Sequence, residues 1–149
     1  MSDRAAASPA SLAYVPLVIE HYRHPRNFGT LDAPTVTGEG ANPLCGDRIR
    51  MDLAVQGDRL EAVRFRGDAC AITIAAASLL TEHVTGQLLV AIETLGEDDV
   101  LALLGAEIPA GRRGCATLPL EVLKAAVRVV RPTGKLGLRP GPHRPWQQA

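Results

Sequence analysis

Two stretches of alternating residues, joined by a short turn, constrain the fold of this chain more than any other feature. Residues 47–56 alternate between aliphatic and mostly charged side chains, and residues 60–66 repeat the pattern. Gly57-Asp58, which lies between them, is typical of a hairpin turn. A weaker strand signal covers residues 35–39. We therefore expect three strands that bury one face of their sheet.

The rest of the apolar periodicity indicates helices, most of which follow the strands in the chain. Pro16 lies near the start of the first helix, where it costs little helix stability because the first N–H groups of a helix have no partner within it. Pro132 is expected to end the last helix. The helices are expected over residues 14–23, 71–83, 88–95, 98–104 and 116–130.

The length and composition favour one folded domain. The chain has 149 residues, of which 46% are hydrophobic and only 3% aromatic, so its core must be mostly aliphatic. We expect a disordered leader over residues 1–13, a domain over 14–131 and a disordered Pro/Arg-rich tail over 132–149. The formal net charge is zero, which gives no electrostatic reason to expect nucleic acid or an anionic membrane as a partner. No apolar run reaches the length of a membrane span.

The cysteines indicate a reducing compartment. The chain has three, and an odd number argues against a disulfide framework. No apolar signal segment is visible in the leader. We therefore expect the protein in the cytoplasm.

A thiol and a carboxylate lie on either side of a glycine in the segment Asn42-Pro43-Leu44-Cys45-Gly46-Asp47. The glycine lets the backbone turn, so that both side chains can face one ion. Cys70 and Cys115 also lie at junctions rich in turn-forming residues. Together with Asp47, the three thiols make four ligands, which suits zinc or an iron–sulfur cluster. The alternative is that the cysteines are simply buried core residues.

The positions of two thiols suggest activated sulfur. Cys70 and Cys115 are each expected at the start of a helix, where the helix dipole lowers the pKa of a thiol. Such thiols suit metal ligation and attack on a persulfide equally well. Arg112 and Arg113 either lower the pKa of Cys115 further or are simply solvated, and His21 is expected to be structural or to face a partner.

Several motifs, in the same order along the chain, resemble those of the U-type iron–sulfur cluster assembly proteins. This is the group that contains SufU, IscU and the N-terminal part of NifU. The resemblance runs from about residue 14 to about residue 131. The motifs are Ile19-Glu20-His21-Tyr22, Pro25-Arg26-Asn27-Phe28-Gly29, Asn42 to Asp47, Phe65 to Ile72, Ala77 to Gly86 and Arg112 to Leu118.

The resemblance implies an α+β fold in which a small three-stranded antiparallel sheet is packed by helices on one face, with the metal site at one end. It implies that Cys45, Asp47, Cys70 and Cys115 bind zinc or a nascent [2Fe-2S] or [4Fe-4S] cluster. It also implies two kinds of partner. A cysteine desulfurase of the SufS or IscS type would supply sulfur, and apo iron–sulfur proteins would receive the product.

The chain departs from both branches of the family. Gly114 stands where IscU-type members carry a histidine, and Arg112 is what SufU-type members carry in the third motif. The segment between Cys70 and Cys115, however, is too short for the insertion of SufU-type members. Only Pro109 matches the chaperone-docking segment of IscU-type members, which argues against a dedicated Hsp70 partner.

Three functions therefore stay open at the level of sequence. The chain is a scaffold for cluster assembly, a zinc-dependent sulfurtransferase or a module with structural zinc. If it accepts sulfur, the most exposed thiol is the natural acceptor, and the resemblance favours Cys115 on a mobile loop. We expect a monomer.

Overall fold

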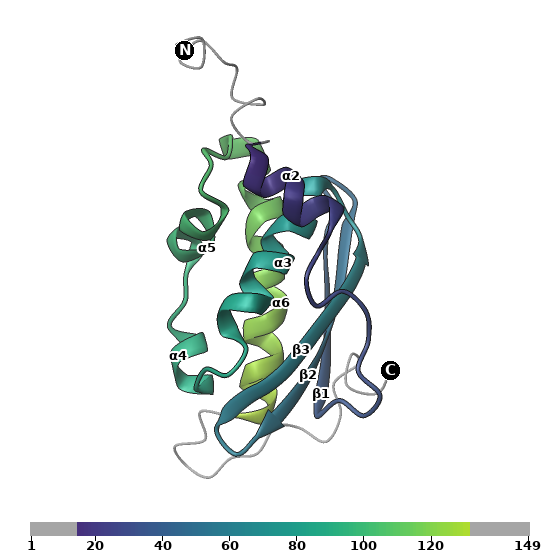
Figure 1. Cartoon of the computed structure of the whole chain (residues 1–149), viewed down its shortest axis with the longest axis vertical. Helices are drawn as coiled ribbons and strands as arrows, with labels where there is room; N and C mark the ends of the chain where they lie inside the picture. Colours follow the sequence, from purple (N-terminus) through teal and green to yellow (C-terminus); the bar gives the residue numbers. More distant parts are fainter. Residues whose placement is uncertain (1–14, 132–149) are drawn as a thin grey trace.

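Three antiparallel strands form a sheet with the order β1-β2-β3. The computed structural model describes residues 15–131 (Figure 1). β1 (Val36–Asn42) pairs with β2 (Asp47–Gln56), which pairs in turn with β3 (Arg59–Asp68). β2 has the bounds expected from the alternation. β1 begins one residue later than expected, and both β1 and β3 continue further towards the end near Asp47, where the ladder pairs additional residues.

The helices cover one face of this sheet, so the expected α+β architecture is confirmed (Figure 1). α3 and α6 lie against the sheet, and α4 and α5 lie on their far side (Figure 1). The helical bounds are α2 Pro16–Arg23, α3 Ala71–Val84, α4 Leu89–Glu93, α5 Glu97–Leu104, the 3₁₀ helix η2 Ala110–Arg112, and α6 Arg113–Val130.

The start of α6 is the main difference from the expected elements. η2 leads directly into α6, which begins at Arg113 rather than at residue 116. Cys115 therefore lies within the first turn of the helix and not at its cap. The glycines at 111 and 114 favour a loop in the sequence, but packing against β1 overrides this weak local preference.

Two glycines let α6 pack closely on β1. A Cβ atom at Gly40 would lie 2.6 Å from Cγ2 of Val122, and one at Gly38 would lie 3.3 Å from the Ala126 side chain. Aliphatic side chains fill most of the rest of the core, together with the fully buried Phe65 of β3. The core therefore depends on close helix–sheet contact rather than on large aromatic side chains.

The connector between α2 and β1, residues 24–35, crosses the outer face of the sheet. It first runs beside β3, where the Phe65 N–H donates to the Asn27 carbonyl, and the Leu31 N–H then donates to Asp52 Oδ2. Thr37 also donates to Asp52, at 2.8 Å. Asp52, expected on the solvent face, is therefore only 2% exposed, because the connector covers that position.

The expected leader (1–13) and tail (132–149) lie outside the described residues, so the domain bounds stay a prediction. Within residues 15–131, no helix is long and apolar enough to cross a membrane.

Candidate metal centre

Four segments bring the expected ligands to one end of the sheet. Asn42 pairs with Asp47 across β1 and β2, and the turn between them carries Cys45. The turn closes because the N–H groups of Cys45 and Gly46 both donate to the Asn42 carbonyl. Gly46 has φ +74°, a left-handed conformation that glycine adopts without strain. Cys70 is the N-cap of α3, and Cys115 comes from the first turn of α6.

The ligand atoms lie close together without any further rearrangement of the chain. Cys45 Sγ is 3.0 Å from Asp47 Oδ2 and 3.0 Å from Cys115 Sγ. The three ligand atoms of Cys45, Asp47 and Cys115 all fall within 4.8 Å of one another. Cys70 lies outside that tight group, but its Sγ is 3.4 Å from Asp47 Oδ2.

The Asp47 carboxylate is held from two sides. The Cys70 N–H donates to Oδ1 at 2.8 Å, and the Thr73 hydroxyl donates to Oδ2 at 2.6 Å. Burial acts to raise the pKa of Asp47, but the hydrogen bonds from Thr73, Cys45 and Cys70 outweigh it and keep the pKa below its ordinary value. Asp47 is 2% exposed and nevertheless ionised, as a metal ligand must be.

The exposure of the thiols corrects two expectations. Cys45 is exposed on its turn, whereas Cys115 is 1% exposed and helical rather than on a mobile loop. Burial raises the pKa of the Cys115 thiol to about 12, which outweighs the hydrogen bond from Arg112 that acts to lower it. The expected lowering by the helix dipole is therefore wrong for Cys115, because loss of hydration dominates.

The donor set fits a thiophilic ion. In a tetrahedral zinc site with Zn–S bonds of about 2.3 Å, neighbouring sulfurs lie about 3.8 Å apart. The 3.0 Å contact between Cys45 and Cys115 must therefore lengthen by less than about 1 Å. Cys45 is on an exposed turn and can supply this movement. Bound zinc would also stabilise the thiolate of Cys115, whose pKa burial otherwise raises.

Other residues singled out in the sequence lie outside the donor group. His21 contacts Ser78 Oγ through Nδ1 at 2.7 Å, which is a structural role. Arg113 forms an ion pair with Glu97 at 3.3 Å. Of the two arginines, Arg112 is therefore the one that acts on the pKa of Cys115.

Two residues support the site in ways that were not predicted from the sequence. Thr73 links Asp47 to the carbonyl of Cys115, which is 3.0 Å from its hydroxyl, and Asn42 holds the Cys45 turn. One signal was available for Thr73, because it lies three residues after the N-cap Cys70 and so faces the same end of α3.

The pattern of the NifU-like N terminal domain family matches residues 13–132. The chain belongs to this family. The recognition made from the motifs is therefore confirmed, and the donor set at the end of the sheet lies within the matched region.

Relatives with two different stated functions are similar to the chain. It is 33% identical to the zinc-dependent sulfurtransferase SufU of Bacillus subtilis, over 76% of this chain and 88% of that protein. It is 37% identical to the iron–sulfur cluster assembly scaffold protein IscU of Azotobacter vinelandii, over 78% and 93%. It is also 41% identical to the bifunctional protein NifU/MnmA of Rubrobacter xylanophilus, over 76% of this chain but only 23% of that much longer protein.

A solved structure supports the architecture. The SufU crystal structure from Fervidobacterium islandicum AW-1 matches with a TM-score of 0.67, covering 79% of this chain and 98% of that one. The sequence identity is 20%, so this likeness establishes the fold alone.

Proposed function

We propose that this protein takes part in iron–sulfur cluster assembly. In this proposal Cys45, Asp47, Cys70 and Cys115 bind zinc or a nascent cluster, and the protein receives sulfur from a cysteine desulfurase. The observation that carries the proposal is the convergence of three thiols and one hydrogen-bonded carboxylate at a single end of the sheet. Delivery to apo iron–sulfur proteins and a cytoplasmic location belong to the same proposal, since three free thiols need a reducing compartment.

The residues of the site have distinct parts in this function. Asp47 is the only hard, oxygen donor among soft sulfur ligands, so it is the ligand expected to exchange most readily. Thr73 and the Cys70 N–H hold its carboxylate towards the thiols. Cys45, on the exposed turn, is the thiol that an incoming group reaches first.

A second candidate function is zinc-dependent sulfur transfer without cluster assembly. In this reaction an acceptor thiolate attacks the outer sulfur of a desulfurase persulfide, a new sulfur–sulfur bond forms and the desulfurase thiolate leaves. The likeness to SufU supports this candidate, and the likeness to IscU supports the scaffold. We propose Cys115 as the acceptor, as the resemblance implies, but its burial makes Cys45 the competing choice.

The first experiment measures zinc, iron and acid-labile sulfide per chain in freshly purified protein. We compare the wild type with Cys45→Ser and Asp47→Asn, and Asp68→Asn serves as the matched control because Asp68 is an exposed carboxylate. One metal equivalent that is lost in the first two variants and kept in the control supports the shared site. Full metal content in Cys45→Ser would contradict it.

The second experiment separates the candidate functions. A SufS-type or IscS-type desulfurase and cysteine are added, and persulfide on each thiol is located by mass spectrometry. Persulfide at Cys115 or Cys45 that persists without cluster formation supports sulfur transfer, whereas conversion to bound iron and sulfide supports the scaffold. If no thiol is modified and turnover of the desulfurase is unchanged, the zinc is structural.

A further inference from the structure

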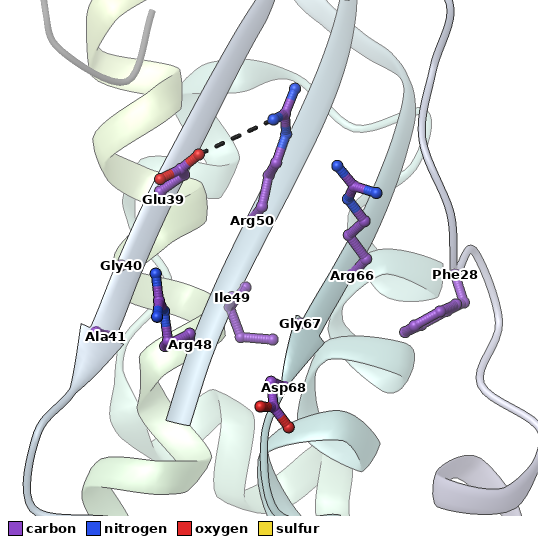
Figure 2. Close-up of a pocket in the computed structure, with 10 residues that line it drawn as sticks. All are labelled: Phe28, Glu39, Gly40, Ala41, Arg48, Ile49, Arg50, Arg66, Gly67 and Asp68. Carbon is purple, nitrogen blue, oxygen red and sulfur yellow. Dashed lines mark ion pairs between the residues drawn. The ribbon is translucent and has the colours of Figure 1, made fainter. Parts of the chain in front are cut away.

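The outer face of the sheet, which faces away from α3 and α6, carries neighbouring arginines near the metal centre (Figure 2). The strand register places Glu39, Arg50 and Arg66 side by side across the three strands. One step closer to the metal centre, it places Ala41, Arg48 and Asp68 side by side. We call Arg48, Arg50 and Arg66 the arginine face.

Contacts within the fold explain only Arg50 of the arginine face. Arg50 forms ion pairs with Asp52 at 3.3 Å and with Glu39 at 3.9 Å. Within residues 15–131, the guanidinium groups of Arg48 and Arg66 form no hydrogen bond or ion pair. Arg66 also lies directly opposite Arg50 in the ladder, and like charges in this position destabilise a sheet. Two cations are therefore available for a group outside the chain.

The arginine face lines a hollow that continues around the edge of β3. The hollow has a volume of about 680 Å³ and is bordered by Phe28, whose side chain is 46% exposed. A second hollow of about 430 Å³ shares Phe28, Gly67 and Asp68 with the first, so the two form one groove. The wall of the second part includes Tyr22 and Ile74 beside the charged Arg23 and Asp68.

We propose that this groove binds an extended, acidic segment of a partner protein. Arg48 and Arg50 are two residues apart on β2, so their Cα atoms are about 6.8 Å apart. An extended peptide repeats its side chains on one face at the same interval of about 6.8 Å. Carboxylates at every second position therefore meet the unpaired Arg48 and then the position of Arg50, where Arg66 on the neighbouring strand supplies the unpaired guanidinium group. An apolar or aromatic residue of the segment packs beside Phe28.

The groove favours protein over nucleic acid. Glu39 and Asp68 interrupt the positive charge of the arginine face, which suits carboxylates spaced along an extended peptide better than a continuous line of phosphates. In the second part of the groove, Tyr22, Pro25 and Ile74 offer contacts to apolar side chains, and Asp68 accompanies Arg23, so no unbroken positive surface is present for a sugar–phosphate backbone.

Docking at this place brings the partner to the metal centre. The second part of the groove includes Ala69, the residue before the N-cap Cys70. A bound segment would therefore lie beside the ligand loops without covering the exposed Cys45 turn. The inference does not rest on the proposed function, because binding is measured without metal or sulfur transfer.

The test uses a fluorescein-labelled ten-residue peptide of alternating glutamate and valine that ends in phenylalanine. Binding is followed by fluorescence anisotropy and mapped by amide chemical shifts. We expect the double variant Arg48→Gln/Arg66→Gln to bind about tenfold more weakly. The reason is that it loses two exposed ion pairs with the peptide, each of which contributes about 0.5–1 kcal/mol to binding. Arg128→Gln is the matched control, because Arg128 is an exposed arginine on α6 outside the groove, and it should bind as the wild type does.

Two further measurements test the spacing of the glutamates and the stability of the double variant. A peptide of the same composition with its glutamates in one block should bind more weakly, because its spacing does not match the strands. The melting temperature of the double variant should equal or exceed that of the wild type, so a loss of binding cannot come from unfolding.

Three results would overturn the proposal. The first is equal binding by the wild type and the double variant, or shifts that map away from Phe28 and Arg66. The second is equally tight, variant-sensitive binding of a duplex DNA of matched charge, which would identify a nucleic-acid surface. The third is a dimer, detected by sedimentation and lost in the double variant, with no peptide binding, which would assign the groove to a second copy of the chain.

Discussion

At the scale of single residues, the polar atoms around Asp47 decide what the centre can bind. A buried carboxylate is costly unless hydrogen bonds compensate it, and here Thr73 makes the shortest of them at 2.6 Å. Thr73 is itself fully buried, and its hydroxyl also lies 3.0 Å from the Cys115 carbonyl. It therefore positions Asp47 relative to α6 without being a ligand.

Replacing Thr73 by valine should weaken zinc binding about 10- to 100-fold, as is typical when an outer partner of a metal ligand is removed. Valine has the same shape but cannot donate, so Asp47 would lose its orientation. Thr73→Ser keeps the hydroxyl and should bind zinc nearly as the wild type does. Competition with a chromogenic chelator measures both affinities, and a wild-type affinity in the valine variant would refute the positioning role.

At the scale of elements, the contact between β1 and α6 places Cys115 beside the Cys45 turn. Gly38 and Gly40 permit this contact, because any side chain there would meet Val122 or Ala126. A second contact joins α2 to α3 through His21 and Ser78. The centre is thus held by packing between elements that are distant in the sequence.

Replacing Gly40 by alanine should lower the free energy of unfolding by about 1–3 kcal/mol, the usual cost of overpacking a core. The new methyl would lie 2.6 Å from Val122 Cγ2, so the Val122 side chain or α6 must shift. Gly111→Ala is the control, since nothing lies within 4 Å of its Cβ position. Chemical denaturation measures both variants, and equal stabilities would show that β1 and α6 do not depend on this close approach.

The α2–α3 contact predicts how stability depends on pH. Burial lowers the pKa of His21, and the positive charge of Arg26 lowers it further, while Glu82 and Glu20 act in the opposite direction. The unfolded chain therefore binds more protons than the folded chain below about pH 6.5, so stability falls as the pH drops through that region.

His21→Gln should flatten this dependence, because the residue that takes up the proton on unfolding is gone. His24→Gln, which removes an exposed histidine nearby, should keep the wild-type slope. Thermal melts between pH 7.5 and 5.5 measure the slopes. A slope in His21→Gln as steep as that of the wild type would assign the pH dependence to other groups.

At the scale of the whole molecule, the four ligands come from the β1–β2 turn, the start of β2, the cap of α3 and the first turn of α6. A bound ion would therefore tie the sheet to both central helices. Binding that occurs only in the folded state stabilises it by mass action.

Removing the metal should accordingly lower the melting temperature. At a free zinc concentration 1,000 times Kd the expected difference is about 4 kcal/mol, or about 10–20 °C for a domain of this size. Calorimetry of zinc-loaded and chelator-treated protein measures it. The difference should vanish in Cys45→Ser, and its survival there would place the ion elsewhere.

The sequence by itself determined the strands, the helices and the membership in the family. Alternation over residues 47–56 predicted β2 to the residue, because burial of one face of a strand imposes a period of two. The motifs around Cys45, Cys70 and Cys115 also located the candidate ligands, since each lies at a junction that the local sequence makes visible.

Only the tertiary structure decided which of these side chains reach water. Cys115 is buried, although we expected it on a mobile loop, because α6 starts early and packs on β1, whereas Cys45 is exposed. Asp52 is buried by a connector that no strand pattern reveals. Burial depends on which distant segments cover a residue, and periodicity reports only the face on which the residue lies. For the same reason the hydroxyl of Thr73 and the groove beside Phe28 became visible only in the folded chain.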